Sequence, residues 1–310
     1  MIEEINMLKN KKIGLITGGI SPERKIAIKG GDAVEKAIKN LKLKYIKLDL
    51  NNKNRMDIFG LIKKRNIDVV FLVLHGRYGE DGTIQGGLDI IKVPYTGSGV
   101  LGSALAMDKV ITKKILIQNN IRTPSYQVLS KGEKLKMNLT VVVKPIDCGS
   151  TIGISIVEKL KNLKKAYNIA FKYGEQILVE KYIKGKEITV PIFNDKPLPV
   201  IEIISKTKFY DYKAKYVKGM STHILPADLP SNVYNEAQNL AIKTHKLLNL
   251  KCFSRVDMIY GTDKKIYVLE ANSLPGLTKT SLLPESARSC GISFEEMVLR
   301  MLIDAIKGRK

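Results

Sequence analysis

The sequence predicts a mixed α/β and α+β protein made of three packed units. Strands that alternate with helices over residues 1–100 indicate a parallel sheet. A strand, strand, helix, strand order within residues 101–184 indicates an α+β unit that does not continue this sheet. A hairpin lies in the third unit, residues 185–310, because two alternating runs at 253–260 and 266–272 flank a turn that contains Gly and Asp.

The composition is typical of a globular protein. Apolar residues make up 44% and charged residues 26% of the 310, and no apolar run approaches the ~20 residues that a membrane helix needs. The net charge of +22 comes mostly from Lys spread over almost every segment, so we expect no specific nucleic-acid partner. The N-terminal segment does not look like a secretory signal, and three widely spaced Cys fit neither a disulfide framework nor a zinc site. We therefore expect a cytoplasmic protein with no membrane contact.

The first unit has its candidate sites in loops. The expected strands are 12–17, 45–49 and 68–74, and the expected helices are 22–41 and 57–65. Ligands gather at the carboxyl ends of parallel strands. Glu23 follows the first strand and either caps a helix or holds an ammonium group. His75 follows the third strand and is either structural or part of a site. Residues 97–102 have the GxGxxG spacing, but no acid follows about 20 residues later, so tight loop geometry explains the glycines better than a dinucleotide site.

The second and third units alternate less regularly. We expect a helix at 101–119, strands at 140–144 and 154–157, a helix at 162–173, strands at 176–180, 187–193 and 198–204, and a helix at 232–248. The final helix begins with the capping box of Ser293 and Glu296 and runs to about residue 306. Residues 205–221 have no clear period and are expected to form a long loop.

Two segments of the second unit could contact a nucleotide. Lys144 ends an apolar strand, and the following loop, 147–153, is rich in Gly and hydroxyl residues whose backbone N–H groups could cover phosphate oxygens. An ordinary hairpin with a surface Lys is the alternative. The strand 176–180 could be an edge strand that offers backbone groups to an adenine, while a nearby carboxylate takes ribose hydroxyls. A plain edge strand is the alternative there.

The hairpin at 253–272 is the most informative stretch. Residues two apart in a strand face the same way, and a turn centred between Asp263 and Lys264 places Asp257 opposite Glu270 and Arg255 opposite Asn272. Two carboxylates and an amide oxygen on one face form a hard-oxygen site suited to Mg²⁺ shared with phosphates. Arg255 beside them could hold a second anion. The alternative is a solvated hairpin with a charged outer face.

These motifs carry a family resemblance. The run RVDMIY…YVLEANSLPGLTKTSL resembles the metal-binding end of the ATP-grasp enzymes, and VKP followed by GSTIG resembles the nucleotide-covering loop of the D-alanine–D-alanine ligase family. The resemblance extends in order from Thr17 to Ser281. It implies an ATP-grasp fold with an N-terminal parallel-sheet substrate domain, a central α+β nucleotide-lid domain and a C-terminal α+β domain that carries the metal site, at 1–100, 101–184 and 185–310.

The resemblance also implies the reaction. Two D-alanine molecules would be joined to D-alanyl-D-alanine through an acyl phosphate, with release of ADP and phosphate, for a peptidoglycan precursor. ATP and two Mg²⁺ or Mn²⁺ ions are the expected cofactors, and a homodimer is the expected assembly. A related ligase that joins D-alanine to D-lactate is an alternative, although Tyr216 favours the dipeptide. A basic nucleic-acid-binding protein and a nicotinamide-dependent enzyme are more distant alternatives.

Individual roles follow from the same resemblance. The expected nucleotide contacts are Lys109, Lys144, Ser150, Glu180, Lys181, Ile183, Glu187 and Lys215, and the expected metal ligands are Asp257, Glu270 and Asn272. Glu23, Ser150 and Tyr216 would form one hydrogen-bonded cluster at the amino group of the first substrate. His75, Ser281 and Leu282 would lie near the carboxylate of the second substrate. Arg255 and a backbone N–H near Gly276 would meet the reaction oxyanion. The sequence departs from the family pattern at Lys25 and at 221–226.

Overall fold

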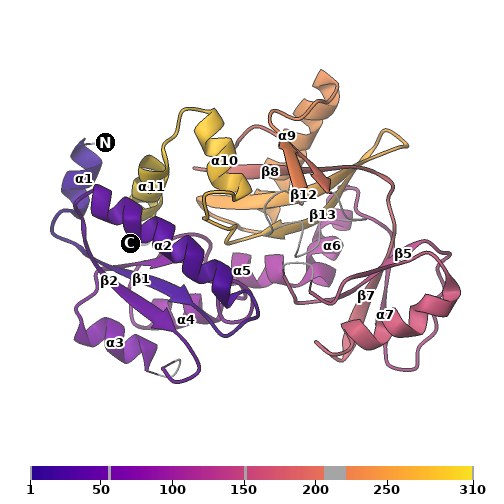
Figure 1. Ribbon diagram of the computed structural model, residues 1–310, viewed down its shortest axis with the longest axis horizontal. Coiled ribbons are helices and arrows are strands. Elements are labelled where there is room, and N and C mark those ends of the chain that lie inside the picture. The colour runs from indigo at the N-terminus through magenta and orange to yellow at the C-terminus, as the bar shows by residue number, and fades with distance from the viewer. Residues whose placement is uncertain (1, 55–56, 150–151, 206–220, 309–310) are drawn as a thin grey trace.

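The computed structural model describes residues 2–54, 57–149, 152–205 and 221–308. Its strands form three sheets, each with its own helices, and Figure 1 shows the three groups arranged one after another along the longest axis. The first sheet is parallel and the other two are antiparallel. The mixed α/β and α+β class predicted from the sequence is therefore confirmed.

The first sheet has the order β2-β1-β3. Its elements are β1 (Lys12–Gly18), α2 (Arg24–Asn40), β2 (Lys44–Leu50), α3 (Ile58–Lys64) and β3 (Val69–Leu72). Each lies within a few residues of its predicted bounds, because the strands are short apolar runs separated by turn residues. The C-terminal helix α11 (Phe294–Lys307) packs on α2 and β3, and its Met297 and Leu302 are part of the same buried core. The first core thus draws on both ends of the chain.

The predicted helix 101–119 is two helices, α5 (Val100–Met107) and α6 (Lys109–Gln118). Asp108 between them has extended backbone angles and is the N-cap of α6. Its carboxylate accepts hydrogen bonds from Val110 N at 2.8 Å and Ile111 N at 2.9 Å. An Asp cap satisfies N–H groups that a helix start leaves without partners, so it ends one helix and begins the next.

The second sheet has the order β4-β7-β5-β6. Its elements are β4 (Tyr126–Ser130), β5 (Val141–Pro145), β6 (Ser155–Val157), the 3₁₀ turn η1 (Leu160–Asn162), α7 (Leu163–Ala170) and β7 (Gln176–Lys181). The expectation that β7 is an edge strand is wrong, because β4 pairs with its outer side and β5 with its inner side. The sequence did not reveal β4, whose side chains are mostly half-buried with only Leu129 fully buried.

The third sheet has the order β11-β10-β8-β12-β13, with β9 paired to β8. Its strands are β8 (Gly185–Phe193), β9 (Lys196–Pro197), β10 (Ile201–Ser205), β11 (Ser221–Ile224), β12 (Phe253–Gly261) and β13 (Ile266–Asn272), and α9 (Ser231–Leu247) packs on it. The predicted hairpin register is confirmed, since Asp257 pairs with Glu270 and Arg255 with Asn272. Nearer the turn the pairing shifts by one residue, and this irregularity lies between Asp257 and Met258.

Helices α1 (Ile2–Leu8), α4 (Thr83–Ile90) and α10 (Leu282–Ser289) were not predicted. α4 contains two Gly, which weaken a helical sequence signal. The cap of α11 was predicted, and Ser293 Oγ accepts the N–H of Glu296 at 3.1 Å. No helix in the described ranges has the length and apolarity that crossing a membrane requires.

The glycines at 97–102 serve packing, as expected. Gly97 has a φ of +88°, a value that favours glycine. A Cβ on Gly102 would lie 2.4 Å from the carbonyl oxygen of Asn249. The backbone near Asn249 therefore comes too close to Gly102 for any residue with a side chain.

Candidate active site

The hairpin of β12 and β13 presents the predicted oxygen ligands side by side. Asp257 accepts Arg255 Nε and Nη2, each at 2.8 Å, and Thr189 Oγ1 at 2.6 Å. Asn272 Nδ2 lies 3.1 Å from Asp257 Oδ2. The neighbouring carboxylate, Glu270, lies 3.6 Å from the ammonium of Lys109. The negative charge of each carboxylate is therefore offset by a basic side chain, Arg255 for Asp257 and Lys109 for Glu270.

These residues fit a hard divalent cation. Within the described residues no group of three or more His, Cys, Asp or Glu is placed to hold a metal ion. The hairpin instead has two carboxylates on paired positions, Asp257 and Glu270, and the amide of Asn272 lies beside Asp257. Oxygen donors of this kind suit Mg²⁺ or Mn²⁺ when phosphate oxygens and water complete the coordination.

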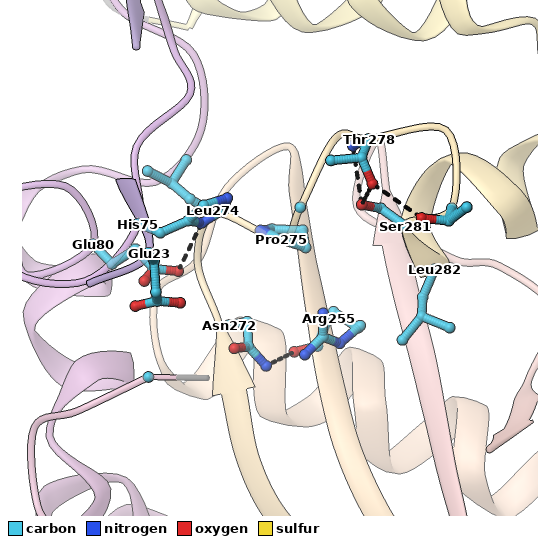
Figure 2. Close-up of a pocket in the computed structure, with 13 residues that line it drawn as sticks. Glu23, His75, Glu80, Arg255, Asn272, Leu274, Pro275, Thr278, Ser281 and Leu282 are labelled. Carbon is cyan, nitrogen blue, oxygen red and sulfur yellow. Dashed lines mark hydrogen bonds and ion pairs between the residues drawn. The ribbon is translucent and has the colours of Figure 1, made fainter. Parts of the chain in front are cut away.

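A solvent-open pocket of about 620 Å³ lies beside this hairpin. Figure 2 shows Glu23, His75 and Glu80 on one side of it, Thr278, Ser281 and Leu282 on the other, and Arg255 and Asn272 between them. The first three come from loops after strands of the parallel sheet, and the others come from β12, β13 and the segment leading into α10. Residues expected to touch the substrates are thus gathered from both ends of the chain.

Glu23 does not cap its helix. It is the N-cap residue of α2, but its side chain makes no capping hydrogen bond, and it is buried at the pocket wall. Gly149 lies opposite, so close that a Cβ on it would be 3.2 Å from Glu23 Oε2. The loop 147–149 and the first loop therefore meet at this carboxylate.

His75 is buried beside acidic groups. Its Nδ1 lies 4.0 Å from Glu80 Oε1, and its Nε2 has no hydrogen-bond partner among the described residues. Burial acts to lower the pKa of His75, but the neighbouring Glu80 and the charge of Glu23 outweigh it and raise this pKa above its usual value. An orphaned buried ring nitrogen at a pocket wall suits a polar ligand.

Glu80 is a site residue that the sequence analysis missed. It lines the pocket, and its Oε2 accepts the N–H of Gly76 at 2.6 Å. The loop sequence HGRYGEDG contains two acids, Glu80 and Asp81, and no pattern distinguishes them. Asp81 instead closes a turn by accepting the N–H of Tyr78 at 2.8 Å.

The opposite wall is held by short polar contacts. Ser281 Oγ accepts the N–H of Thr278 at 3.0 Å and lies 2.8 Å from Thr278 Oγ1. A Cβ on Gly276 would lie 2.8 Å from Ser281 Oγ. Leu282 packs on Ile201 and Ile203 of β10. The segment from Gly276 to Leu282 is therefore fixed against the third sheet.

A second, more apolar pocket of about 770 Å³ lies between the second and third sheets. The predicted nucleotide residues Lys144, Glu180, Lys181, Ile183 and Glu187 line it, together with Asp257 and Glu270. Tyr182 and a set of apolar side chains complete the lining: Pro124, Val142, Ile154, Ile156, Ile259 and Leu269. A pocket with apolar walls and charged groups suits a nucleotide, whose base has flat apolar faces and whose phosphates are anionic.

Glu180 lies between two ammonium groups at this pocket. Lys144 Nζ is 2.7 Å from its Oε2, and Lys113 Nζ is 2.7 Å from its Oε1. Burial alone would raise the pKa of Glu180, but the charges and hydrogen bonds of Lys144 and Lys113 lower it below its usual value. Burial lowers the pKa of Lys113 to about 8. Sequence analysis missed Lys113, which is one of several Lys in a helical segment.

A small third pocket connects the other two. Lys109 lines it, with Gly149, Glu80, Glu270 and Asn272. Glu270 also lines the apolar pocket, and Asn272 also lines the pocket of Glu23 and His75. Two of the predicted metal ligands, Glu270 and Asn272, therefore stand where the three pockets meet, and the third, Asp257, lines the apolar pocket beside Glu270.

Lys109 and Cys148 meet at this junction. Lys109 Nζ donates to the carbonyl oxygen of Cys148 at 2.7 Å. Burial raises the pKa of the Cys148 thiol to about 11, so the thiol is neutral near pH 7. The structure gives Cys148 a backbone contact and no reactive thiolate.

Three predicted site residues, Ser150, Lys215 and Tyr216, lie outside the described residues. All the other predicted site residues line one of the three pockets.

Known proteins match nearly the whole chain. Residues 109–303 match the family described as D-ala D-ala ligase C-terminus, and residues 50–98 match D-ala D-ala ligase N-terminus. D-alanine–D-alanine ligase of Geotalea uraniireducens (strain Rf4) is 44% identical over 306 residues, covering 97% of each chain. The enzyme of Carboxydothermus hydrogenoformans is 43% identical over 314 residues, covering 96% of this chain and 99% of the relative.

Solved structures match equally widely. The crystal structure of D-alanine–D-alanine ligase from Bacillus anthracis complexed with ATP aligns with a TM-score of 0.83 at 35% identity, covering 96% of this chain and 98% of that one. Another structure of the Bacillus anthracis enzyme aligns with a TM-score of 0.85 at 38% identity over the same shares of each chain. The chain, an enzyme of the class its sequence predicted, belongs to the D-alanine–D-alanine ligase family.

Proposed function

We propose that this protein uses ATP to join two D-alanine molecules into D-alanyl-D-alanine, releasing ADP and phosphate, for a peptidoglycan precursor. The observation that carries the proposal is the junction of the three pockets at Glu270 and Asn272. A phosphoryl group transferred from one pocket to a carboxylate in the next must pass such a point. Relatives named for this reaction, and one solved with ATP, support the choice of substrates.

The nucleotide would occupy the apolar pocket. Its base would lie among the apolar side chains near Ile183, and Glu187, which lines the same pocket, would take the ribose hydroxyls. Lys144 lines this pocket, and Lys109 lines the neighbouring small pocket with its ammonium 3.6 Å from Glu270 of the hairpin. The phosphates would lie near these two ammonium groups. A Lys ammonium is a compact point charge that suits phosphate oxygens.

Asp257, Glu270 and Asn272 would hold two Mg²⁺ or Mn²⁺ ions with the phosphates. Bound ions of this kind neutralise charge that develops during phosphoryl transfer. Arg255 holds Asp257 by two hydrogen bonds. It thereby orients that carboxylate, and its guanidinium also lines the pocket of Glu23 and His75.

The two amino acids would lie in the pocket of Glu23 and His75. The Glu23 carboxylate suits the ammonium of the first D-alanine, and the family resemblance adds Ser150 and Tyr216 to this contact. The carboxylate of the first D-alanine attacks the γ-phosphorus of ATP, ADP leaves, and an acyl phosphate forms. The amine of the second D-alanine then attacks the acyl carbon, and phosphate leaves. Arg255 and a backbone N–H near Gly276 would stabilise the oxyanion of that step.

The second D-alanine would be held by its carboxylate. His75, whose charged form is favoured by Glu80 and Glu23, stands on one wall, and Ser281 and Leu282 stand on the other. The assignment of residues 1–100, 101–184 and 185–310 to substrate, nucleotide-lid and metal-site domains is part of the proposal, as are a cytoplasmic location and a homodimer.

Purified protein with ATP, Mg²⁺ and D-alanine tests the proposal by release of phosphate and formation of the dipeptide. D-alanine-dependent ADP release with stoichiometric D-alanyl-D-alanine is the expected result. Adding D-lactate at equal concentration separates the dipeptide ligase from the D-alanine–D-lactate ligase, because only the latter forms the ester product. Absence of both products with Mg²⁺ and with Mn²⁺ would refute the proposal.

A further inference from the structure

Lys113 is a completely buried cation without a role in the site described so far. Its side chain is 0% exposed, on the second turn of α6. Its ammonium lies 2.7 Å from Glu180 Oε1, donates to Thr123 Oγ1, and lies 5.6 Å from the centre of the Tyr126 ring. Lys109 precedes it by four residues, so both face the same side of the helix.

A buried ammonium is costly to the fold. The free-energy cost of taking the charge out of water cancels much of the attraction to Glu180. An apolar side chain of similar size would therefore stabilise the fold as well or better. Lys113 lines none of the three pockets. Two of its contacts do line the nucleotide pocket: Glu180 at 2.7 Å and, more weakly, the carbonyl oxygen of Pro124 at 3.4 Å. The short ion pair with Glu180 is the stronger link to the site.

The charges of the cluster explain what that effect is. Glu180 is 2% exposed and shares its one negative charge between two ammonium groups, one on each oxygen. Lys113, Glu180 and Lys144 together carry one net positive charge, and only Lys144 among the two Lys lines the nucleotide pocket. Without Lys113, Glu180 would neutralise Lys144 alone, and its Oε1 would lose the contact that fixes the carboxylate in place.

We propose that Lys113 is a positioning residue for the nucleotide pocket. It holds Glu180 by one oxygen, so that Lys144 keeps part of its positive charge for an anionic phosphate. The inference rests on the proposed function only in taking ATP as the ligand.

Four variants test it: Lys113→Met, Glu180→Gln, the double variant, and Lys114→Met. Lys114 is the exposed neighbour on the same helix and is the matched control. Calorimetry measures the Kd of ATP with Mg²⁺ in the absence of D-alanine, and steady-state assays give kcat and both KM values. Lys113→Met should weaken ATP binding by about 10- to 100-fold, the range for losing a contact between charged groups. The KM of ATP should rise in parallel while the KM of D-alanine stays unchanged, and Lys114→Met should match the wild type.

The double variant distinguishes positioning from general support of the fold. If Lys113 acts through Glu180, Lys113→Met should add less than about threefold to the loss already caused by Glu180→Gln. An equal loss in both backgrounds, or unchanged ATP affinity in folded Lys113→Met, overturns the inference. Lys113→Gln, which keeps a donor without charge, takes the place of Lys113→Met if the latter does not fold, with the same outcomes. A wild-type protein that binds no ATP would instead refute the proposed function.

Discussion

Replacing Glu270 with Gln should remove activity and leave the fold nearly unchanged. The carboxylate lies 3.6 Å from Lys109 Nζ, and its side chain is 23% exposed. Coulomb attraction at that distance is about 1 to 5 kcal/mol, depending on the effective dielectric, but desolvation and partial exposure leave a net contribution of about 1 kcal/mol or less. Lys109 also keeps its hydrogen bond to the Cys148 carbonyl oxygen. Urea unfolding should therefore detect little change.

Turnover should respond much more strongly. Glu270 stands where the nucleotide pocket and the connecting pocket join, so the variant removes a full negative charge from the proposed metal site without changing its shape. Losing one aligned electrostatic contact to a transition state costs about 3 kcal/mol or more, which corresponds to a kcat at least about 10²-fold lower. Coupled ADP release at saturating ATP, Mg²⁺ and D-alanine measures this effect.

Glu236→Gln is the matched control for this experiment. Glu236 also pairs with a basic side chain, Arg122 at 3.9 Å, but it lines none of the three pockets. It should retain wild-type turnover. A Glu270→Gln variant that keeps kcat within about threefold of the wild type would refute the metal assignment, because the charge would then have no part in the transition state.

Three further substitutions address other parts of the site. Gly276→Ala would place a Cβ 2.8 Å from Ser281 Oγ, so the KM of the second D-alanine should rise more than that of the first; equal changes in initial-rate kinetics would contradict this. Glu80→Gln removes a charge that raises the pKa of His75 against the effect of burial. The resulting loss of stability should be full below about pH 6.5 and disappear as pH rises through the folded-state pKa, and a loss that is constant from pH 6 to pH 9 in urea unfolding would argue against it. Asp108→Ala removes the two cap hydrogen bonds of α6 and should cost about 1 kcal/mol of unfolding free energy, with Asp108→Asn losing less.

Local sequence patterns were sufficient for the hairpin and for most strands. Asp257 and Glu270 lie at equal distances from the predicted centre of the turn, so they are expected to pair. Alternation in a strand fixes which side chains share a face. The cap of α11 is equally local, since Ser293 and Glu296 lie within one helical turn. The family resemblance predicted the remaining site residues, because the nucleotide and substrate contacts occur in short sequence runs such as VKP and HGRYGEDG.

Long-range packing decided what these patterns could not. β4 covers the outer side of β7, although its own residues are only half-buried, and this makes a strand that looked like an edge an interior one. Glu80 and Asp81 are neighbours in sequence, and only the fold of their loop turns one toward the pocket and uses the other in a turn.

The sequence by itself determined the family, the order of most strands and of the longer helices, and the carboxylates on one face of the hairpin. Only the tertiary structure decided that Lys113 is buried against Glu180, 67 positions away in the chain, and that Glu23 faces Gly149 and not its own helix. Whether a charged side chain is solvated or paired depends on which distant segments exclude water from it. No local spacing encodes that exclusion, because it arises only when separate sheets pack together.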